Sequence, residues 1–562
     1  MMRKFKKRYI CAVLCALTVL TSLCACANKT DEAVESNIAF DTARDSDTAA
    51  AIGELTREAL EGYTIVYPQF EDDIFEEIVR ELTLAIKTKY GVELNTADDF
   101  VREGTKFVVK DKEILLGWTN REESKSVCEE IKKVGDYEIR LVGEKLVIAG
   151  MSKESMTDAV KKFIEIMESN GDEILFEQSQ SVSFKVMYEL ETITLNGTDI
   201  SEYTIVYQDN CEKLARSISE LITERTGIAL TLQSTIKSLP EGKNIYVGNT
   251  TAPKPYSKND EDAYFIGVVN DDFYLYSEDI VGVNRAVNEF VEALNNTNGS
   301  VTVDAGRITY EDTSLKSMTF NVYWDTSDST RVNNVITTIK KHMPDTFGVQ
   351  EATGEWMNKL NDALKDDYAY VGVGRNGTGD INDEYCAVFY RKDKFKLVDS
   401  GTKWLSRTPD KVSKMEGAIY QRIFTYALLE DIQTKKQLVH INTHTDHVSP
   451  DEGGYQVRLE QVKVITAFIK ANFADIPYIV SGDLNDPKTA PSISHLLASG
   501  MDDSADIALI SDKEPTFKQT TIDFLLVSEG DFTVYEYDVE TEKFNGSYPS
   551  DHRAVIIKYD LN

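Results

Sequence analysis

The 562-residue sequence has few cysteines and few histidines, and its basic residues are outnumbered by acidic ones. Beyond residue 26, only Cys128, Cys211 and Cys386 remain of its seven cysteines, and they lie far apart in the chain. This spacing excludes a disulfide framework and a cysteine-rich zinc cluster. Stability must therefore come from ordinary hydrophobic cores, which a chain of this length can bury.

The shortage of basic residues leaves a formal net charge of −33. Leu315–Asn562 carries −11 of this charge and the preceding residues carry −22. An acidic surface gives no electrostatic attraction for a polyanion, so the charge does not favour nucleic acid as a partner. A bound metal ion would reverse the sign locally, and that alternative stays open.

The apolar run at the start of the chain is short. Ile10–Cys24 follows a basic segment and spans about 15 residues, the length of a signal-peptide core rather than of a membrane-spanning helix. It ends at Leu23-Cys24-Ala25-Cys26, which resembles the lipoprotein box of bacterial signal peptides. The resemblance implies that residues 1–25 are removed, that Cys26 is lipidated, and that the mature protein is extracytoplasmic and anchored to the bacterial cell membrane. An ordinary cleaved signal peptide is the alternative.

The segment after Cys26 is polar, acidic and rich in Ser, Thr and Ala. It shows no apolar periodicity, so residues 26–55 are predicted to form a flexible tether. The length that remains corresponds to between two and four domains.

The first half of the chain contains two similar segments. Tyr63–Tyr67 recurs letter for letter at Tyr203–Tyr207, and each copy precedes an amphipathic helical pattern that ends at a glycine, Gly91 or Gly227. Later strand and helix patterns also correspond, with an offset that loop insertions would explain. The sequence therefore predicts two repeated small α/β sandwich domains, at residues 56–180 and 190–310.

These two predicted domains resemble the small α/β domain that precedes the catalytic barrel in hexosaminidase and glucuronidase families. No histidine occurs before His342, and nothing in either copy indicates catalysis. A spacer or scaffold is the simpler interpretation. Contact with a glycan or the cell wall is the functional alternative.

In the C-terminal half, polar side chains follow apolar, strand-like runs. Asn321 lies within one run, and Glu351, His444 and Asp483 come at the ends of others. Enzymes of the α/β class place their chemistry at such ends, because a rigid sheet fixes the side chains there. A glutamate at a buried strand end needs a partner, and a hard cation is a suitable one. Asp483 and Asn485 are two residues apart, so both would lie on one face of an extended strand.

Six ordered motifs in this half resemble the endonuclease/exonuclease/phosphatase family. They are Asn321, Gln350-Glu351, Asn442-Thr443-His444, Gly482-Asp483-Leu484-Asn485, Ile522-Asp523 and Ser550-Asp551-His552. Asp399–Ser406 resembles a bacterial, often secreted branch of that family. The resemblance covers residues 315–562. It implies a four-layer α/β sandwich, with two packed mixed sheets flanked by helices, and divalent-metal-dependent hydrolysis of a phosphodiester or phosphomonoester.

The resemblance also implies residue roles. Mg²⁺, or Mn²⁺ or Ca²⁺, would be held by Glu351 with Asn321 and Asp551 close by. Asp483 would orient or deprotonate the attacking water. The substrate phosphate would contact Asn485, His444 and, as a weaker candidate, Arg422. His552 held by Asp523 and His444 held by Glu384 would form two histidine–carboxylate pairs, and either histidine could be the general acid.

One departure from the family leaves the substrate open. Secreted members of this branch carry a histidine and a longer loop before the strand that starts at Ile522, whereas this chain has Thr516–Thr521 there. Nucleic acid, sphingomyelin and sugar phosphates remain alternative substrates. A surface glycan- or wall-binding lipoprotein with an idle phosphoesterase fold is the alternative of another class.

Overall fold

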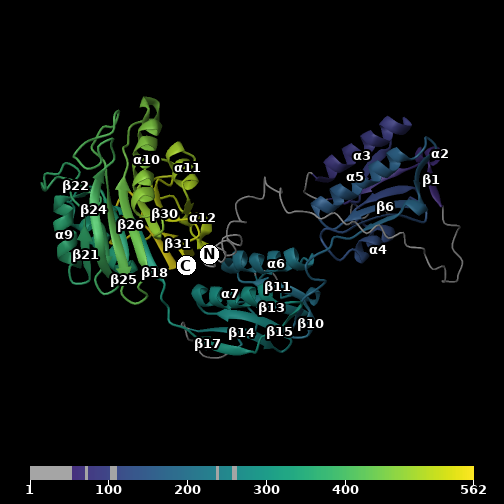
Figure 1. The fold of residues 1–562 in the computed structure, drawn as a ribbon, viewed down its shortest axis with the longest axis horizontal. Coiled ribbons are helices and arrows are strands. Elements are labelled where there is room, and N and C mark those ends of the chain that lie inside the picture. Colours follow the sequence, from purple (N-terminus) through teal and green to yellow (C-terminus); the bar gives the residue numbers. More distant parts are fainter. Residues whose placement is uncertain (1–52, 70–73, 101–109, 236–238, 256–262) are drawn as a thin grey trace. The chain divides into compact units, whose positions relative to one another are not determined.

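A computed structural model describes residues 53–69, 74–100, 110–235, 239–255 and 263–562 (Figure 1). The predicted signal peptide, the lipidation at Cys26 and nearly all of the predicted tether lie outside these ranges. Within them, no helix has the length and apolar character that crossing a membrane requires. The described residues up to Thr309 form one compact unit, and Tyr310–Asn562 form another.

A six-stranded mixed sheet lies at the centre of the first small domain, in the order β3-β2-β4-β6-β5-β8. Helices α3 and α5 share an apolar core with this sheet, and α4 packs on a smaller core that includes Val66 and Val147. The elements are β2 (Thr64–Tyr67), α3 (Ile74–Tyr90), β3 (Asn95–Asp98), β4 (Glu113–Leu116), α4 (Glu122–Glu130), β5 (Tyr137–Val142), β6 (Lys145–Gly150), α5 (Lys153–Ser169) and β8 (Val182–Phe184). A separate strand pair joins β1 (Glu54–Thr56) to β7 (Ile174–Glu177).

The second small domain has a corresponding sheet, in the order β12-β11-β13-β15-β14-β17. Its elements are β11 (Tyr203–Tyr207), α6 (Glu212–Thr226), β12 (Leu232–Ser234), β13 (Lys243–Val247), β14 (Ala263–Val269), β15 (Asp272–Ser277), α7 (Ile280–Asn296) and β17 (Gly306–Thr309). In both domains the first four strands in the sheet order are parallel and the next is antiparallel. Gly91 and Gly227 follow α3 and α6 with φ of +69° and +74°, the conformation that ends a helix at glycine.

The C-terminal unit contains two large mixed sheets. The seven-stranded sheet has the order β21-β23-β19-β18-β32-β31-β29, and the six-stranded sheet has the order β24-β25-β26-β27-β30-β28. Their strands are β18 (Leu315–Asn321), β19 (Thr346–Gln350), β21 (Tyr368–Val371), β23 (Val388–Arg391), β24 (Phe395–Trp404), β25 (Ile423–Asp431), β26 (Gln437–His444), β27 (Tyr478–Asp483), β28 (Met501–Asp503), β29 (Ile510–Ser511), β30 (Asp523–Ser528), β31 (Phe532–Val539) and β32 (Val555–Leu561).

Three hydrophobic cores define four layers in this unit (Figure 1). Helices α8 (Ser329–His342) and α9 (Gly354–Leu364) pack on the seven-stranded sheet. Helices α10 (Gly454–Asn472) and α11 (Pro491–Ala498) pack on the six-stranded sheet. The third core combines side chains of both sheets, such as Ile479 and Ile557. This arrangement confirms the predicted α/β class, with mixed sheets flanked by helices.

Buried polar side chains also connect the two sheets near their centre. The Asn442 amide on β26 donates to the backbone carbonyls of Val349 (2.8 Å) and Ala387 (2.9 Å). His440 contacts Thr346 at 2.9 Å and Ser481 at 2.8 Å. Because these bonds are buried and directional, they fix how β19 and β26 lie against each other, and therefore where their ends meet.

Candidate active site

Six strand ends meet at one edge of the paired sheets. β18 and β19 are parallel, as are β26 and β27, while β32 and β30 run antiparallel to their neighbours. The carboxyl ends of the first four strands therefore lie at the same edge as the amino ends of the last two. In this register His444 lies opposite Asp483, and Asp483 lies opposite Asp523.

An acidic cluster joins the two sheets at this edge. The amide of Asn321 on β18 donates to Oε1 of Glu351 at 3.1 Å and to Oδ2 of Asp483 at 3.0 Å. Glu351 comes just after β19 with a φ of +57°. A residue with a Cβ rarely adopts this left-handed conformation, and such strain is concentrated at functional sites. The backbone amide of Trp324 donates to the other Glu351 oxygen at 3.3 Å and holds the carboxylate in place.

Asp483 lies between two imidazoles. Its Oδ2 is 3.5 Å from Nε2 of His444 and 3.7 Å from Nε2 of His552. Burial and the neighbouring Asp523 carboxylate raise the pKa of Asp483 to about 7, although the charge of His552 opposes them. A carboxylate with this pKa is basic enough to accept a proton at neutral pH.

His552 is held by Asp523, as the sequence predicted. Its Nδ1 is 2.9 Å from Oδ2 of Asp523, and the Phe517 ring stacks on the imidazole with centroids 4.5 Å apart. Burial lowers the pKa of His552, but the carboxylates of Asp523, Asp483 and Asp551 outweigh it and raise the pKa to about 10. The imidazole is therefore charged at neutral pH.

His444 has the opposite character. Its pKa lies well below the usual range because the side chain is buried, and because Arg422 and Arg375 place positive charge nearby. The sequence left the two histidines interchangeable. Their surroundings distinguish them, since His552 carries a proton at neutral pH and His444 is neutral there.

Glu384 does not support His444. The sequence predicted a His444–Glu384 pair, but the Glu384 carboxylate accepts from Arg375 at 2.7 Å and pairs with it. The recorded ion-pair partner of His444 is Asp483. The arginine competes successfully because a guanidinium carries a permanent charge, whereas the buried imidazole is neutral.

Asn485 also differs from expectation. β27 ends at Asp483, and Asn485 lies beyond it with a left-handed φ of +49°. The prediction that the two side chains share a strand face is therefore wrong. They are linked instead by a turn, in which the Asn485 backbone amide donates to Oδ1 of Asp483 at 2.9 Å. The Asn485 side-chain amide donates to the Thr445 carbonyl at 3.1 Å.

The oxygen-rich cluster fits a hard divalent cation. Two sets of side chains bring ligand atoms within 4.8 Å of one another, namely Glu351 with His444 and Asp483, and Asp483 with Asp523 and His552. In the first set the Asn321 amide nitrogen donates to both carboxylates and holds Glu351 and Asp483 side by side, and carboxylate oxygens are ligands that Mg²⁺ prefers. Asp551 is exposed and accepts from Ser550 at 3.2 Å, and its predicted place beside the metal stays a prediction.

A basic group that the sequence largely missed lies next to His444. Arg422 was a minor candidate, and Arg375 carried no motif that would have identified it. Both line a small cavity together with Glu351, Glu384 and His444. Arg422 contacts Nδ1 of His447 at 3.0 Å.

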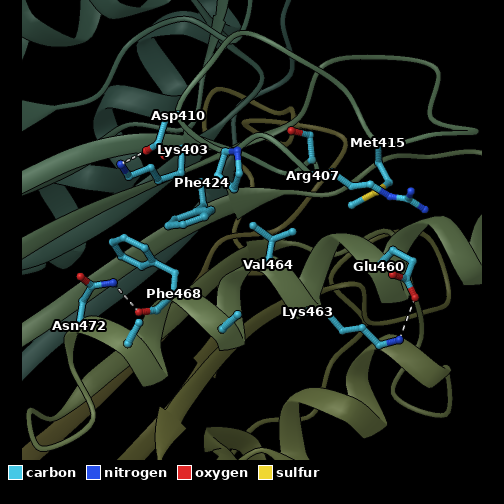
Figure 2. A pocket seen from close by; sticks show the side chains of 14 residues that line it. Lys403, Arg407, Asp410, Met415, Phe424, Glu460, Lys463, Val464, Phe468 and Asn472 are labelled. Atoms are coloured by element: carbon cyan, nitrogen blue, oxygen red, sulfur yellow. Dashed lines mark hydrogen bonds and ion pairs between the residues drawn. The ribbon is translucent and has the colours of Figure 1, made fainter.

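A larger groove of about 580 Å³ lies elsewhere on this unit, between α10 and the segment around β24 and β25 (Figure 2). Its floor is apolar, with Phe424, Val464 and Phe468, and charged side chains such as Lys403 and Lys463 stand at its rim. Of the strand-end cluster, His444 and Glu351 line a different cavity. Size alone therefore does not mark the site of chemistry in this protein.

Residues 318–552 match the profile of the Endonuclease/Exonuclease/phosphatase family. This match identifies the C-terminal unit as a domain of that family and as a phosphoric ester hydrolase. No match was found among curated proteins.

Several solved structures are similar to part of this chain. An endonuclease/exonuclease/phosphatase from Bacteroides vulgatus is 28% identical and covers 45% of this chain and 100% of its own, with a TM-score of 0.42. A mannosyl-6-phosphatase from Bacteroides thetaiotaomicron is 28% identical over 44% of this chain and 100% of its own, with a TM-score of 0.41. A functionally unknown conserved protein from Enterococcus faecalis is 25% identical over 44% and 100%, with a TM-score of 0.41.

Proposed function

Starting from a C-terminal domain of the endonuclease/exonuclease/phosphatase family, we propose that this protein hydrolyses a phosphate ester outside the cytoplasm by in-line attack of water, with a divalent cation. The observation that carries the proposal is the meeting of Asn321, Glu351, His444, Asp483 and the Asp523–His552 pair at one edge of the two sheets. These side chains provide a carboxylate base, a charged imidazole and oxygen ligands in a single cluster, which is buried except for the half-buried Glu351.

The clustered side chains have separate roles in the proposed hydrolysis. A bound Mg²⁺ or similar cation supplies positive charge that offsets the anionic phosphate and favours attack. Asp483, with a raised pKa, orients the attacking water and takes its proton. His552, charged and oriented by Asp523, gives a proton to the leaving oxygen. Neutral His444 and the side-chain amide of Asn485 would contact phosphate oxygens.

Turnover by the full chain tests the proposal. Purified protein is assayed with p-nitrophenyl phosphate and bis(p-nitrophenyl) phosphate in Mg²⁺ or Mn²⁺, and again after chelation with EDTA. We expect metal-dependent release of p-nitrophenol, and a loss of about 10³-fold or more in Asp483→Asn, because the variant keeps the shape but not the base. Asp410→Asn, an exposed carboxylate at the groove rim, is the matched control. Activity that survives both EDTA and Asp483→Asn would contradict the proposed chemistry.

The proposed location rests on the first 26 residues. The basic start, the short apolar run and Leu23–Cys26 together support export and lipidation at Cys26. In a bacterial host, the protein should fractionate with membranes and carry lipid on its mature N-terminus, as read by mass spectrometry. Cys26→Ser should release it from the membrane fraction. An unmodified, soluble mature chain starting elsewhere would point to an ordinary signal peptide.

Because the acidic charge does not select a substrate, a panel of DNA, RNA, sphingomyelin and sugar phosphates is the direct comparison. The surface-binding alternative predicts no hydrolysis of any of them, together with retention on a glycan array.

A further inference from the structure

Two arginines, Arg375 and Arg422, lie next to His444 in the candidate active site. Arg375 and Arg422 line a small cavity that they share with Glu351 and His444, and this cavity is separate from the large groove of Figure 2. Both guanidiniums lie against the Tyr420 ring, at 4.6 Å and 5.7 Å from its centroid. The Tyr420 ring therefore holds two guanidinium charges, and both guanidiniums belong to the lining of this cavity.

These charges are only partly balanced by protein groups. Glu384 pairs with Arg375 at 2.7 Å, but Asp446 approaches Nε of Arg422 only to 3.8 Å. That carboxylate already accepts from the backbone amides of Ile419 (3.1 Å) and Tyr420 (3.0 Å).

The Arg422 side chain is 4% exposed, and its Nε has no hydrogen-bond partner among the residues that the structure describes. A buried guanidinium with an unused donor, close to a second guanidinium, is costly unless an anion joins it. The cavity beside the two arginines is where such an anion would lie.

The shape of the cavity limits what that anion can be. It offers about 10 Å³ for the centre of a water-sized group, which is room for one oxygen atom. Cys386 and Ile423, both buried, close its wall. A phosphoryl oxygen fits this space, whereas a carbon substituent continuing from the phosphate does not. A phosphodiester could place one of its non-bridging oxygens here but carries a single negative charge, whereas the dianion of a phosphomonoester matches the two guanidinium charges.

We propose that the substrate is a phosphomonoester, and that Arg375 and Arg422 bind the terminal oxygens of its dianionic phosphate and so select it over diesters. The inference rests on the proposed phosphoesterase function and deepens it. In the reaction, water forms a new P–O bond and the ester P–O bond breaks. Asp483 takes the proton of the water, the leaving oxygen receives a proton from His552, and the products are an alcohol and inorganic phosphate.

Two substrates with the same leaving group test the selection. The full chain with Mg²⁺ is assayed with p-nitrophenyl phosphate and with bis(p-nitrophenyl) phosphate. The wild type should have the higher kcat/KM for the monoester. Arg375→Gln should lower the monoester value by about 10–100-fold, the effect of losing a charge-assisted hydrogen bond, and change the diester value by less than about threefold. Arg375→Lys should recover part of the loss because it restores the charge.

A matched control and a second variant separate binding from folding. Arg407 lies between Arg375 and Arg422 in the sequence, and 84% of its side chain is exposed. Arg407→Gln should change kcat/KM for neither the monoester nor the diester. Arg422→Gln should repeat the selective loss, with a thermal melt to verify that it folds. If Arg422→Gln unfolds, the monoester and diester values of Arg375→Gln alone decide whether the arginines select the monoester. Equal losses on both substrates, or a wild type that prefers the diester, would overturn the inference.

Calorimetry with inorganic phosphate gives a readout that needs no turnover. Phosphate should bind the Mg²⁺-loaded wild type and bind Arg375→Gln at least about tenfold more weakly. Absence of turnover with either ester would contradict the proposed function, while this titration would still judge the arginine site. Phosphate affinity that is unchanged in Arg375→Gln, or undetectable in the wild type, would overturn the inference.

Discussion

At the scale of single residues, two histidines on one strand show how surroundings set chemistry. His440 and His444 are both on β26 and both buried. His440 contacts two hydroxyls, those of Thr346 and Ser481, and burial lowers its pKa to about 3. His444 lies at the strand end, next to a carboxylate and two arginines. The first histidine therefore serves structure and the second serves the site.

His440 makes the stability of the C-terminal unit depend on pH. Its folded pKa is below the unfolded value of about 6.5, so the unfolded chain binds the extra proton and protonation favours unfolding. Its contribution is complete above pH 6.5 and is lost progressively as the pH falls toward 3. We expect it to account for about 1 kcal/mol of lost stability at pH 5.5 relative to pH 7.5. Urea unfolding of the wild type and of His440→Gln at both pH values measures this, and an equally steep loss in the variant would contradict it.

Asp523 sets the charge of the other active-site histidine. Asp523→Asn removes the carboxylate that orients His552 and raises its pKa. We expect kcat to fall by about 10²–10⁴-fold with a small change in KM, as when a histidine loses its orienting carboxylate. Steady-state kinetics on the better p-nitrophenyl substrate measures both constants. Glu529→Gln, an exposed position just past the other end of β30, should leave them unchanged.

At the scale of elements, the contact between β19 and β26 leaves no room for a side chain at Gly348. A Cβ there would lie 2.4 Å from Cγ of Asn442 and 2.8 Å from Oγ of Ser481. Asn442 cannot move easily, because its amide bridges to two backbone carbonyls of the facing sheet. The glycine is therefore required by packing between the sheets, and not by an unusual φ.

Gly348→Ala should destabilise the C-terminal unit by about 1–3 kcal/mol, the usual cost of overpacking a tight core. Thermal or urea unfolding of the full chain measures the change. Gly171→Ala is the control, since a Cβ there meets nothing within 4 Å. A neutral Gly348→Ala would show that the two sheets can separate to accept a methyl group.

The elements also show where sequence patterns succeed. The helix patterns after both Tyr-Thr-Ile-Val-Tyr strands end at glycines with positive φ. These are local properties of the chain, governed by periodicity and capping. The strand-face argument for Asp483 and Asn485 failed because the strand ends between them, and strand ends depend on partners that are far away in the sequence.

At the scale of the whole molecule, separate cores predict separate unfolding. The described residues form two compact units, each with its own hydrophobic clusters. Heating should therefore give more than one transition. Mg²⁺ should raise only the transition of the C-terminal unit, because binding to the folded state stabilises it by mass action. Differential scanning calorimetry with Mg²⁺ and with EDTA measures this.

Glu351→Gln supplies the control for that experiment. The variant should remove the Mg²⁺-dependent shift and keep the other transition unchanged, since Glu351 belongs to the oxygen cluster of the C-terminal unit. A shift that persists in Glu351→Gln would place the cation elsewhere.

The sequence by itself determined the α/β class and the phosphoesterase motifs, and its motifs named most of the side chains that meet at the strand ends. Motif order and apolar periodicity are local properties and can be read without coordinates. The tertiary structure decided which charged side chains of the site contact one another. It pairs Glu384 with Arg375 rather than His444, and it brings Arg375 and Arg422 to the wall of the active site. Those contacts join segments far apart in the sequence, and charge, burial and distance choose among partners only after the sheets have packed.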